Sequence, residues 1–141
     1  ANESGDNKRY LSDFIALMRD AYTIGHISNA AKKAESLQRI RKWSLDMADT
    51  KVGRERQKAF LQYAQKQVRE NYIANLQQPQ LNYQTAEERD FSQRFAPYIN
   101  DTNVEQIMNE LDKAEQQITQ NGNAKIIFFD LCLQFIVLLK K

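Results

Sequence analysis

The placement of glycine and proline constrains the fold of this chain more than any other feature of its sequence. Its four glycines and two prolines fall between segments in which apolar residues recur every three or four positions. Such recurrence is typical of amphipathic helices, which glycine and proline commonly end. Because no segment shows the alternation of a strand, the sequence predicts an all-α fold, a compact bundle of five to six helices.

The expected helices cover residues 8–23, 28–48, 53–77, 85–96, 102–120 and 123–139. On the second helix, the residues expected to face the core are Ala30, Ala34, Leu37, Ile40, Trp43 and Met47. On the first, third and fifth helices they are Leu11, Phe14, Leu17, Met18, Ala21, Tyr22, Phe60, Leu61, Ala64, Val68, Tyr72, Leu76, Val104, Ile107, Met108, Leu111, Ala114 and Ile118. Residues 126–139 are almost all apolar but too few for a bilayer, which needs about 20. We therefore expect the C-terminal helix to be buried at the centre of the bundle.

Local signals mark most of the helix ends. We expect Gly25 to end the first helix and Ser28 to cap the second by accepting backbone N–H bonds. Residues 85–88 and 102–105 each read Thr-x-x-Glu, the pattern of a capping box, in which the two side chains bond reciprocally to backbone N–H groups. These two boxes should open the fourth and fifth helices.

The remaining signals lie in the C-terminal half of the chain. Pro79 opens a polar loop over residues 80–84. Asn121 and Gly122 are expected to stop the fifth helix, with glycine in the left-handed conformation. Asn123 should then cap the C-terminal helix.

Length and composition indicate one globular domain. The chain has 141 residues, 42% of them hydrophobic and 27% charged, as is ordinary for a single domain. We expect residues 8–141 to form that domain and residues 1–7 to be a disordered tail or tag remnant. The net charge of +2 identifies no partner. Because the only cysteine, Cys132, has no partner for a disulfide, we expect a reduced, cytoplasmic compartment. We also expect no membrane, because the apolar run at residues 126–139 is too short to span a bilayer.

Side chains that catalyse reactions or bind metals are sparse in this sequence. The only histidine, His26, is expected in a connection, and Cys132 in an apolar run. Glu105, Asn109 and Asp112 share one helix face, but di-iron bundles also need Glu-x-x-His motifs, which are missing. No two glycines lie closer than 20 residues, so there is no phosphate-binding loop. We predict no catalytic residue, metal or cofactor in this segment.

Positive charge is concentrated in the first half of the chain. Residues 1–70 hold 14 Lys and Arg against 9 Asp and Glu, whereas residues 71–141 hold 6 against 9. Such asymmetry is typical of two solvated faces of a bundle, and a charged contact surface would also produce it. The candidate partner-binding residues lie on the second helix and at the start of the third: Arg39, Arg41, Lys42, Arg54, Arg56 and Lys58.

Five stretches of the chain resemble the C-terminal region of a known family. The longest, residues 53–63, reads Gly-Arg-Glu-Arg-Gln-Lys-Ala-Phe-Leu-Gln-Tyr. The others are Phe14-x-x-x-Met18-Arg19, Arg69-Glu70-Asn71, Phe95-x-Pro97-Tyr98-Ile99 and Asn121-x-Asn123-x-Lys125-Ile126-Ile127-Phe128-Phe129-Asp130-Leu131. Together they resemble the delta prime subunit of bacterial DNA polymerase III, a clamp-loader subunit, in the version found in Bacteroides-type bacteria. The resemblance covers residues 8–140.

The resemblance implies a structural function in DNA replication. In clamp loaders, five helical collar domains pack as a ring, while N-terminal ATPase-type modules engage ATP, DNA and the sliding clamp. This sequence resembles only the collar, so no catalytic residue of the family carries over. The implied role is oligomerisation with gamma/tau-type and delta-type subunits, without nucleotide binding or direct DNA contact. The alternatives are a basic nucleic-acid-binding module and the equivalent collar of a gamma/tau-type subunit.

Overall fold

The computed structural model describes residues 3–75, 85–95 and 98–140, and in this part of the chain every element is an α-helix. The helices are α1 (Glu3–His26), α2 (Ala30–Met47), α3 (Gly53–Asn75), α4 (Ala86–Phe95), α5 (Val104–Thr119) and α6 (Ala124–Leu138). The all-α bundle predicted from the sequence is confirmed. Leu76, the loop expected after Pro79 and the helix end expected before Pro97 lie outside the described residues.

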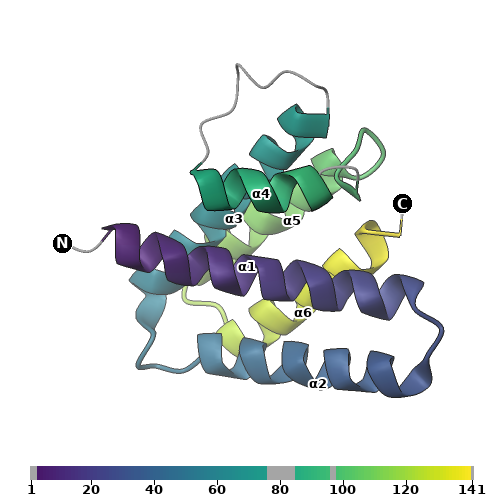
Figure 1. The fold of residues 1–141 in the computed structure, drawn as a ribbon. Coiled ribbons are helices and arrows are strands. Elements are labelled where there is room, and N and C mark those ends of the chain that lie inside the picture. Colours follow the sequence, from purple (N-terminus) through teal and green to yellow (C-terminus); the bar gives the residue numbers. More distant parts are fainter. Residues whose placement is uncertain (1–2, 76–84, 96–97, 141) are drawn as a thin grey trace.

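Helix α1 lies between α2 on one side and α4 on the other, with α6 behind it (Figure 1). It is longer than the sequence indicates, because its backbone is helical from Glu3 and its last turn continues to His26. Helices α3 and α5 form the most extensive helix pair, and α6 contacts α1, α2 and α5. The C-terminal helix is therefore packed on three sides by other helices.

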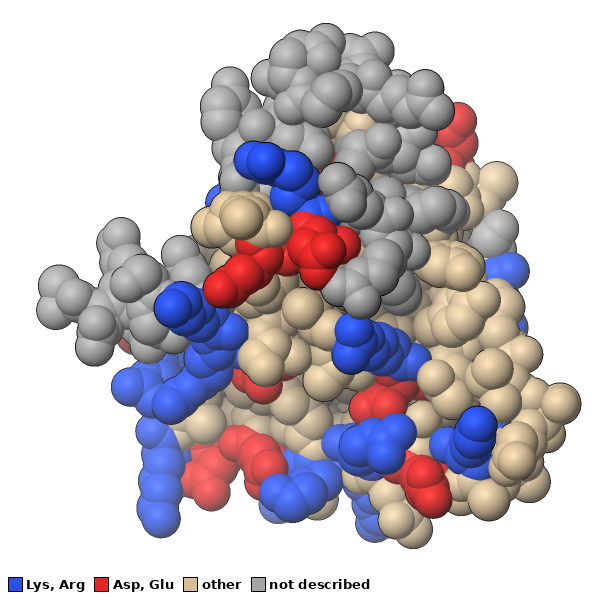
Figure 2. Space-filling view, viewed as in Figure 1, with Lys and Arg blue, Asp and Glu red and all other residues tan. Residues whose placement is uncertain are grey.

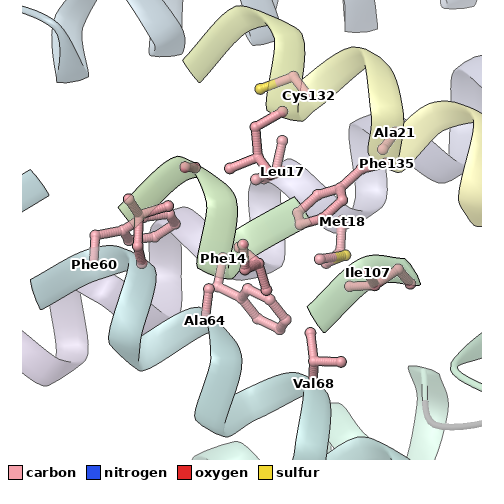
Figure 3. Close-up of a cluster of buried hydrophobic side chains, with 14 of the residues drawn as sticks. Phe14, Leu17, Met18, Ala21, Phe60, Ala64, Val68, Ile107, Cys132 and Phe135 are labelled. Carbon is pink, nitrogen blue, oxygen red and sulfur yellow. The ribbon is translucent and has the colours of Figure 1, made fainter. Parts of the chain in front are cut away.

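Apolar side chains from four helices meet in one core. Figure 3 shows Phe14 and Met18 of α1 among side chains of α3, α5 and α6, including Phe60, Ile107 and Phe135. All five are at most 1% exposed. Full burial of one such side chain contributes about 1.5–3 kcal/mol, so this cluster holds the four helices together. The core faces predicted for α1, α3 and α5 are confirmed, with half-buried residues at their edges.

The predicted inward face of α2 is wrong at its N-terminal end. Ala30, Ala34 and Leu37 are exposed, and Leu37 keeps 41% of its surface. The buried positions include Ser36 and Ser44 instead. Ser44 donates to the carbonyl oxygen of Ile40 at 3.0 Å, so burial leaves its hydroxyl satisfied. The small serines face the core, and the larger Leu37 is left outside.

The C-terminal helix is expected to be buried, and the structure buries only one of its faces. One face of α6 is buried, but Ile126 is 67% exposed, Val137 52% and Leu133 39%. Because α6 is apolar nearly all round, the helices packed on three of its sides cannot cover every apolar residue. Neither α6 nor any other described helix is long and apolar enough to cross a membrane.

The first capping box is confirmed, whereas the second is wrong. The Thr85 hydroxyl accepts from the N–H of Glu88 at 3.1 Å, and the Glu88 carboxylate accepts from the N–H of Thr85 at 2.9 Å. At the start of α5, the Thr102 hydroxyl instead donates to the side-chain oxygen of Asn100. Asn103 takes the N-cap position, and its amide donates to the backbone carbonyls of residues 98 and 138. These bonds join the turn to the C-terminal helix and displace the expected box.

Asparagine rather than serine caps α2. The side chain of Asn29 accepts from the N–H of Lys32 at 3.1 Å, so the cap lies one residue after the predicted Ser28. Asn123 caps α6 as predicted, accepting from the N–H of Ile126 at 3.3 Å. Gly25 does not end α1. A Cβ at Gly25 would lie 3.3 Å from the Ile136 carbonyl oxygen, so glycine at this position permits the close approach of α6.

The end of α5 is a Schellman motif, but the left-handed residue is not the one that the sequence predicts. Asn121, not Gly122, has the positive φ, at 64°. The N–H of Gly122 bonds to the Gln117 carbonyl at 2.8 Å, and that of Asn121 to the Ile118 carbonyl at 3.1 Å. A Cβ at Gly122 would lie 2.8 Å from both the Gln117 oxygen and the Ile127 side chain. Glycine is required there for space.

This motif predicts opposite results for two neighbouring substitutions. Gly122→Ala should lower the free energy of unfolding by about 1–3 kcal/mol, because the added methyl group overlaps backbone. Asn121→Gly should leave stability unchanged or raise it, because glycine adopts the left-handed conformation without steric cost. Urea unfolding followed by circular dichroism measures both. Equal stability of Gly122→Ala and the wild type would contradict the close contact.

Candidate functional site

An apolar groove runs between α2 and α6, which point in opposite directions (Figure 1). It encloses about 590 Å³ and is lined by Leu37, Gln38, Arg41, Ser44, Leu45, Lys125, Ile126, Phe129, Asp130 and Leu133. We call these ten residues the α2–α6 groove. All ten residues belong to α2 and α6, so no other described helix lines the groove.

Helical spacing places the apolar side chains of the groove in two rows. On α2, Leu37 and Leu45 lie two turns apart with Arg41 between them. On α6, Ile126 and Leu133 lie seven residues apart, which also puts them on one face. Each helix thus has a second apolar row besides the one that packs inside. Exposed apolar surface of this kind is a candidate site of protein–protein contact.

Charged side chains interrupt both rows of the groove. Arg41 and Lys125 are exposed, and neither forms an ion pair within the described residues. Asp130 is the one carboxylate that lines the groove, and it too forms no ion pair there. The groove therefore combines apolar walls with two available cations and one available anion.

Two of the six predicted contact residues form ion pairs within the chain. Arg39 donates to Asp20 of α1 through two nitrogens, at 2.9 and 3.1 Å. The hydrogen bond to Asp20 raises the pKa of the Arg39 guanidinium. Lys42 forms an ion pair with Asp46 on the next turn, at 2.9 Å. Arg39 fixes α2 against α1, and the charge of Lys42 is balanced locally.

The other four predicted residues lie apart from one another. Arg41 lines the α2–α6 groove, whereas Arg54 donates to the Ile118 carbonyl at the end of α5, at 2.9 Å. Arg56 lines a smaller cleft beside α1, and Lys58 is half-buried. The six residues therefore do not form one basic surface. On the face in Figure 2, Lys and Arg are interspersed with Asp and Glu.

The spacing of residues in the sequence does not identify the apolar residues of the groove. Helical spacing places Leu37 on the face of α2 that is expected to be inward, and the apolar run of residues 126–139 predicts a buried C-terminal helix. The available signal was an excess of apolar positions, because α2 has Leu45 outside its predicted inward face and α6 is apolar on every side. Spacing alone does not show which of two apolar rows packs inside.

A buried polar cluster joins α3 to α4 at another place. The Glu88 side chain accepts from the Tyr63 hydroxyl and the Gln67 amide, each at 2.6 Å. Burial raises the pKa of the Tyr63 hydroxyl well above its usual range, and the bond to Glu88 raises it further. Because Glu88 also completes the capping box with Thr85, the cluster fixes the start of α4 against α3.

The His26 ring packs against an aromatic side chain, and Cys132 belongs to the buried core. The His26 ring stacks on Tyr22 with centroids 4.0 Å apart, in the last turn of α1 rather than in a connection. Cys132 is fully buried, and burial raises the pKa of its thiol to about 12. Asp112 accepts from Gln116 on its own helix. In the described ranges, no group of three His, Cys, Asp or Glu residues is placed to hold a metal ion.

Comparison of this chain with protein-family models, curated proteins and solved structures finds no match. Its function is therefore argued from its own residues and from the geometry of the α2–α6 groove.

Arg54 and Arg56 provide a matched pair for testing which arginine supports the fold. Arg54→Glu should lower the free energy of unfolding by about 1–2 kcal/mol, because it removes a charged donor and sets a carboxylate beside the carbonyls that end α5. Arg56→Glu makes the same change of charge where no hydrogen bond is recorded within the described residues, and should cost less than about 0.5 kcal/mol. Urea unfolding of the two variants checks this; equal losses would contradict the role given to Arg54.

The cluster at Glu88 predicts a loss of stability in alkali. The folded state raises the pKa of Tyr63 above its unfolded value of about 10, so it keeps this proton to higher pH than the unfolded chain does. The stabilisation is complete below about pH 10 and is lost as pH rises, by up to ~1.4 kcal/mol per pH unit. Unfolding free energies measured between about pH 9 and 11 should fall more steeply for the wild type than for Tyr63→Phe. Parallel curves would contradict this.

Proposed function

We propose that this chain is the oligomerisation (collar) domain of a bacterial DNA polymerase III clamp-loader subunit, of the delta prime type. In this role it holds neighbouring subunits together in the ring that loads sliding clamps during DNA replication. The observation that carries the proposal is the α2–α6 groove, an apolar surface that the described helices leave uncovered. A rigid helical bundle with such a face can set the spacing between attached ATPase-type modules.

The free energies of side-chain burial and of association favour a ring of subunits over an isolated pair of subunits. Fully burying a Leu or Ile side chain contributes about 1.5–3 kcal/mol. Four apolar side chains of the groove are already partly buried, so covering the rest of their surface contributes roughly half of that free energy per residue. They are Leu37, Leu45, Ile126 and Leu133. The sum is of the same order as the about 4–15 kcal/mol that association costs. A subunit held by two neighbours in a closed ring gains from both contacts.

The family within this proposal rests on residues of the chain. The stretch over residues 53–63 resembles the delta prime collar, and it forms the first half of α3. The stretch over residues 121–131 spans the Schellman motif and the start of α6, which supplies one wall of the groove. The proposed partners are the gamma/tau-type and delta-type subunits, in the cytoplasm. A gamma/tau-type collar remains the other subunit identity within this proposal.

A nucleic-acid-binding module is less well supported by the geometry. Such a module needs cations free to neutralise phosphates. Arg39 and Lys42 are paired with carboxylates, and Arg54 bonds to a backbone carbonyl. The walls of the groove are apolar, as in a protein interface.

The groove predicts that assembly depends on two leucines. Leu37→Glu with Leu133→Glu should abolish a stable complex with the gamma/tau-type and delta-type subunits of the same bacterium, because two carboxylates would be buried without partners. Both residues are about two-fifths exposed, so the variant should keep its helical circular dichroism spectrum. Size-exclusion chromatography with light scattering measures the assembly.

The control is Ala16→Glu with Asn109→Glu. It adds two carboxylates at exposed positions of α1 and α5 that do not line the groove. The control variant should assemble like the wild type. If a folded wild-type chain forms no complex, the proposed function is wrong. If the leucine variant assembles normally, the groove is not the contact surface.

A further inference from the structure

The charges around the α2–α6 groove specify the chemistry of what fills it. We infer that the groove receives an acidic amphipathic helix from a neighbouring subunit, with its apolar side chains between α2 and α6 and its carboxylates against Arg41 and Lys125. This inference rests on the proposed function, because it names the chemistry of the partner at the same surface.

The shape of the groove fits a helix. Its two walls are helices that run in opposite directions (Figure 1), and Leu37, Leu45, Ile126 and Leu133 project from them. A third helix laid between two others buries residues spaced at three, four and seven positions. The volume of about 590 Å³ accommodates several side chains rather than one. An amphipathic helix supplies such a row on one face.

The sign of the charge around the groove is positive. Arg41 and Lys125 line it against one carboxylate, Asp130. A second hollow, of about 630 Å³, adjoins the groove at Lys125 and is lined further by Arg54 and by the first residues of α3 and α6. No Asp or Glu lines this hollow. The excess of cations continues beyond the end of the groove, so a partner is complementary there when it is acidic.

Neither Arg41 nor Lys125 has a role in holding the described fold together. Both side chains belong to exposed residues without an ion pair in the described ranges. Arg39 and Lys42, which flank Arg41 on α2, each pair with an Asp of this chain. Arg41 is thus available to a carboxylate from outside, and so is Lys125.

The test is a charge-reversal variant, Arg41→Glu with Lys125→Glu, compared with the wild type in binding to purified gamma/tau-type and delta-type subunits. Isothermal titration calorimetry at about 50 mM and 500 mM salt measures the dissociation constant. At low salt the variant should bind at least about tenfold more weakly, and the difference should shrink at high salt, where charges are screened. Arg41→Gln with Lys125→Gln should be intermediate, and it tests the same contact if the reversal variant fails to fold.

The matched control is Lys66→Glu with Lys113→Glu. It makes the same change of net charge at exposed positions of α3 and α5 outside the groove, and it should bind like the wild type. If the wild type binds and the groove variants bind equally well, the acidic helix is wrong while the proposed function stands. If the folded wild type binds neither subunit, both are wrong.

Two further results would replace the acidic helix by another occupant. A wild-type chain that self-associates in light scattering, and becomes monomeric in Leu37→Glu with Leu133→Glu, would show that a second copy fills the groove. Binding of a fluorescent DNA duplex that is lost in Arg41→Glu with Lys125→Glu would show that the cations meet phosphates. Either result would overturn the inference.

Discussion

Helix α6 is apolar on every side, and the bundle can cover only part of it. Helices α1, α2 and α5 bury Phe128, Leu131 and Phe135. The apolar row of Ile126 and Leu133 stays uncovered by the described helices and lines the groove together with Leu37 and Leu45 of α2. Burial of the inner row of α6 stabilises the fold. The outer row, which this burial leaves exposed, forms one wall of the groove. The domain thus folds around the same helix that forms one wall of the groove.

The charged residues divide in a corresponding way. Asp20 with Arg39 joins α1 to α2, Glu88 joins α4 to α3, and Arg54 closes the end of α5. Each of these groups has a partner inside the chain and supports the arrangement of the helices. Arg41 and Lys125 have none in the described part of the chain and lie at the groove. The ion pairs and hydrogen bonds therefore separate the basic residues that support the fold from those available for contact.

Much of the fold follows from short-range patterns in the sequence, whereas the groove depends on distant contacts. The spacing of Phe14 and Phe60 predicted the buried faces of α1 and α3, and the box at residues 85–88 involves neighbours only. The same pattern failed at residues 102–105 because the Asn103 amide bonds to a carbonyl 35 residues away. The rotation of α2 likewise goes with a distant contact, since it places Arg39 beside Asp20, 19 residues away. The groove was missed for this reason, since sequence spacing does not choose between two apolar rows.

The most direct test of the account is side-chain footprinting of the groove with hydroxyl radicals, read by mass spectrometry. The isolated chain and its complex with the gamma/tau-type and delta-type subunits would be oxidised in parallel. The account predicts that Leu37, Leu45, Ile126 and Leu133 become protected in the complex, while exposed residues of α1 and α5 outside the interface react as before. A complex that forms while these four side chains keep the reactivity of the free chain would contradict the central claim.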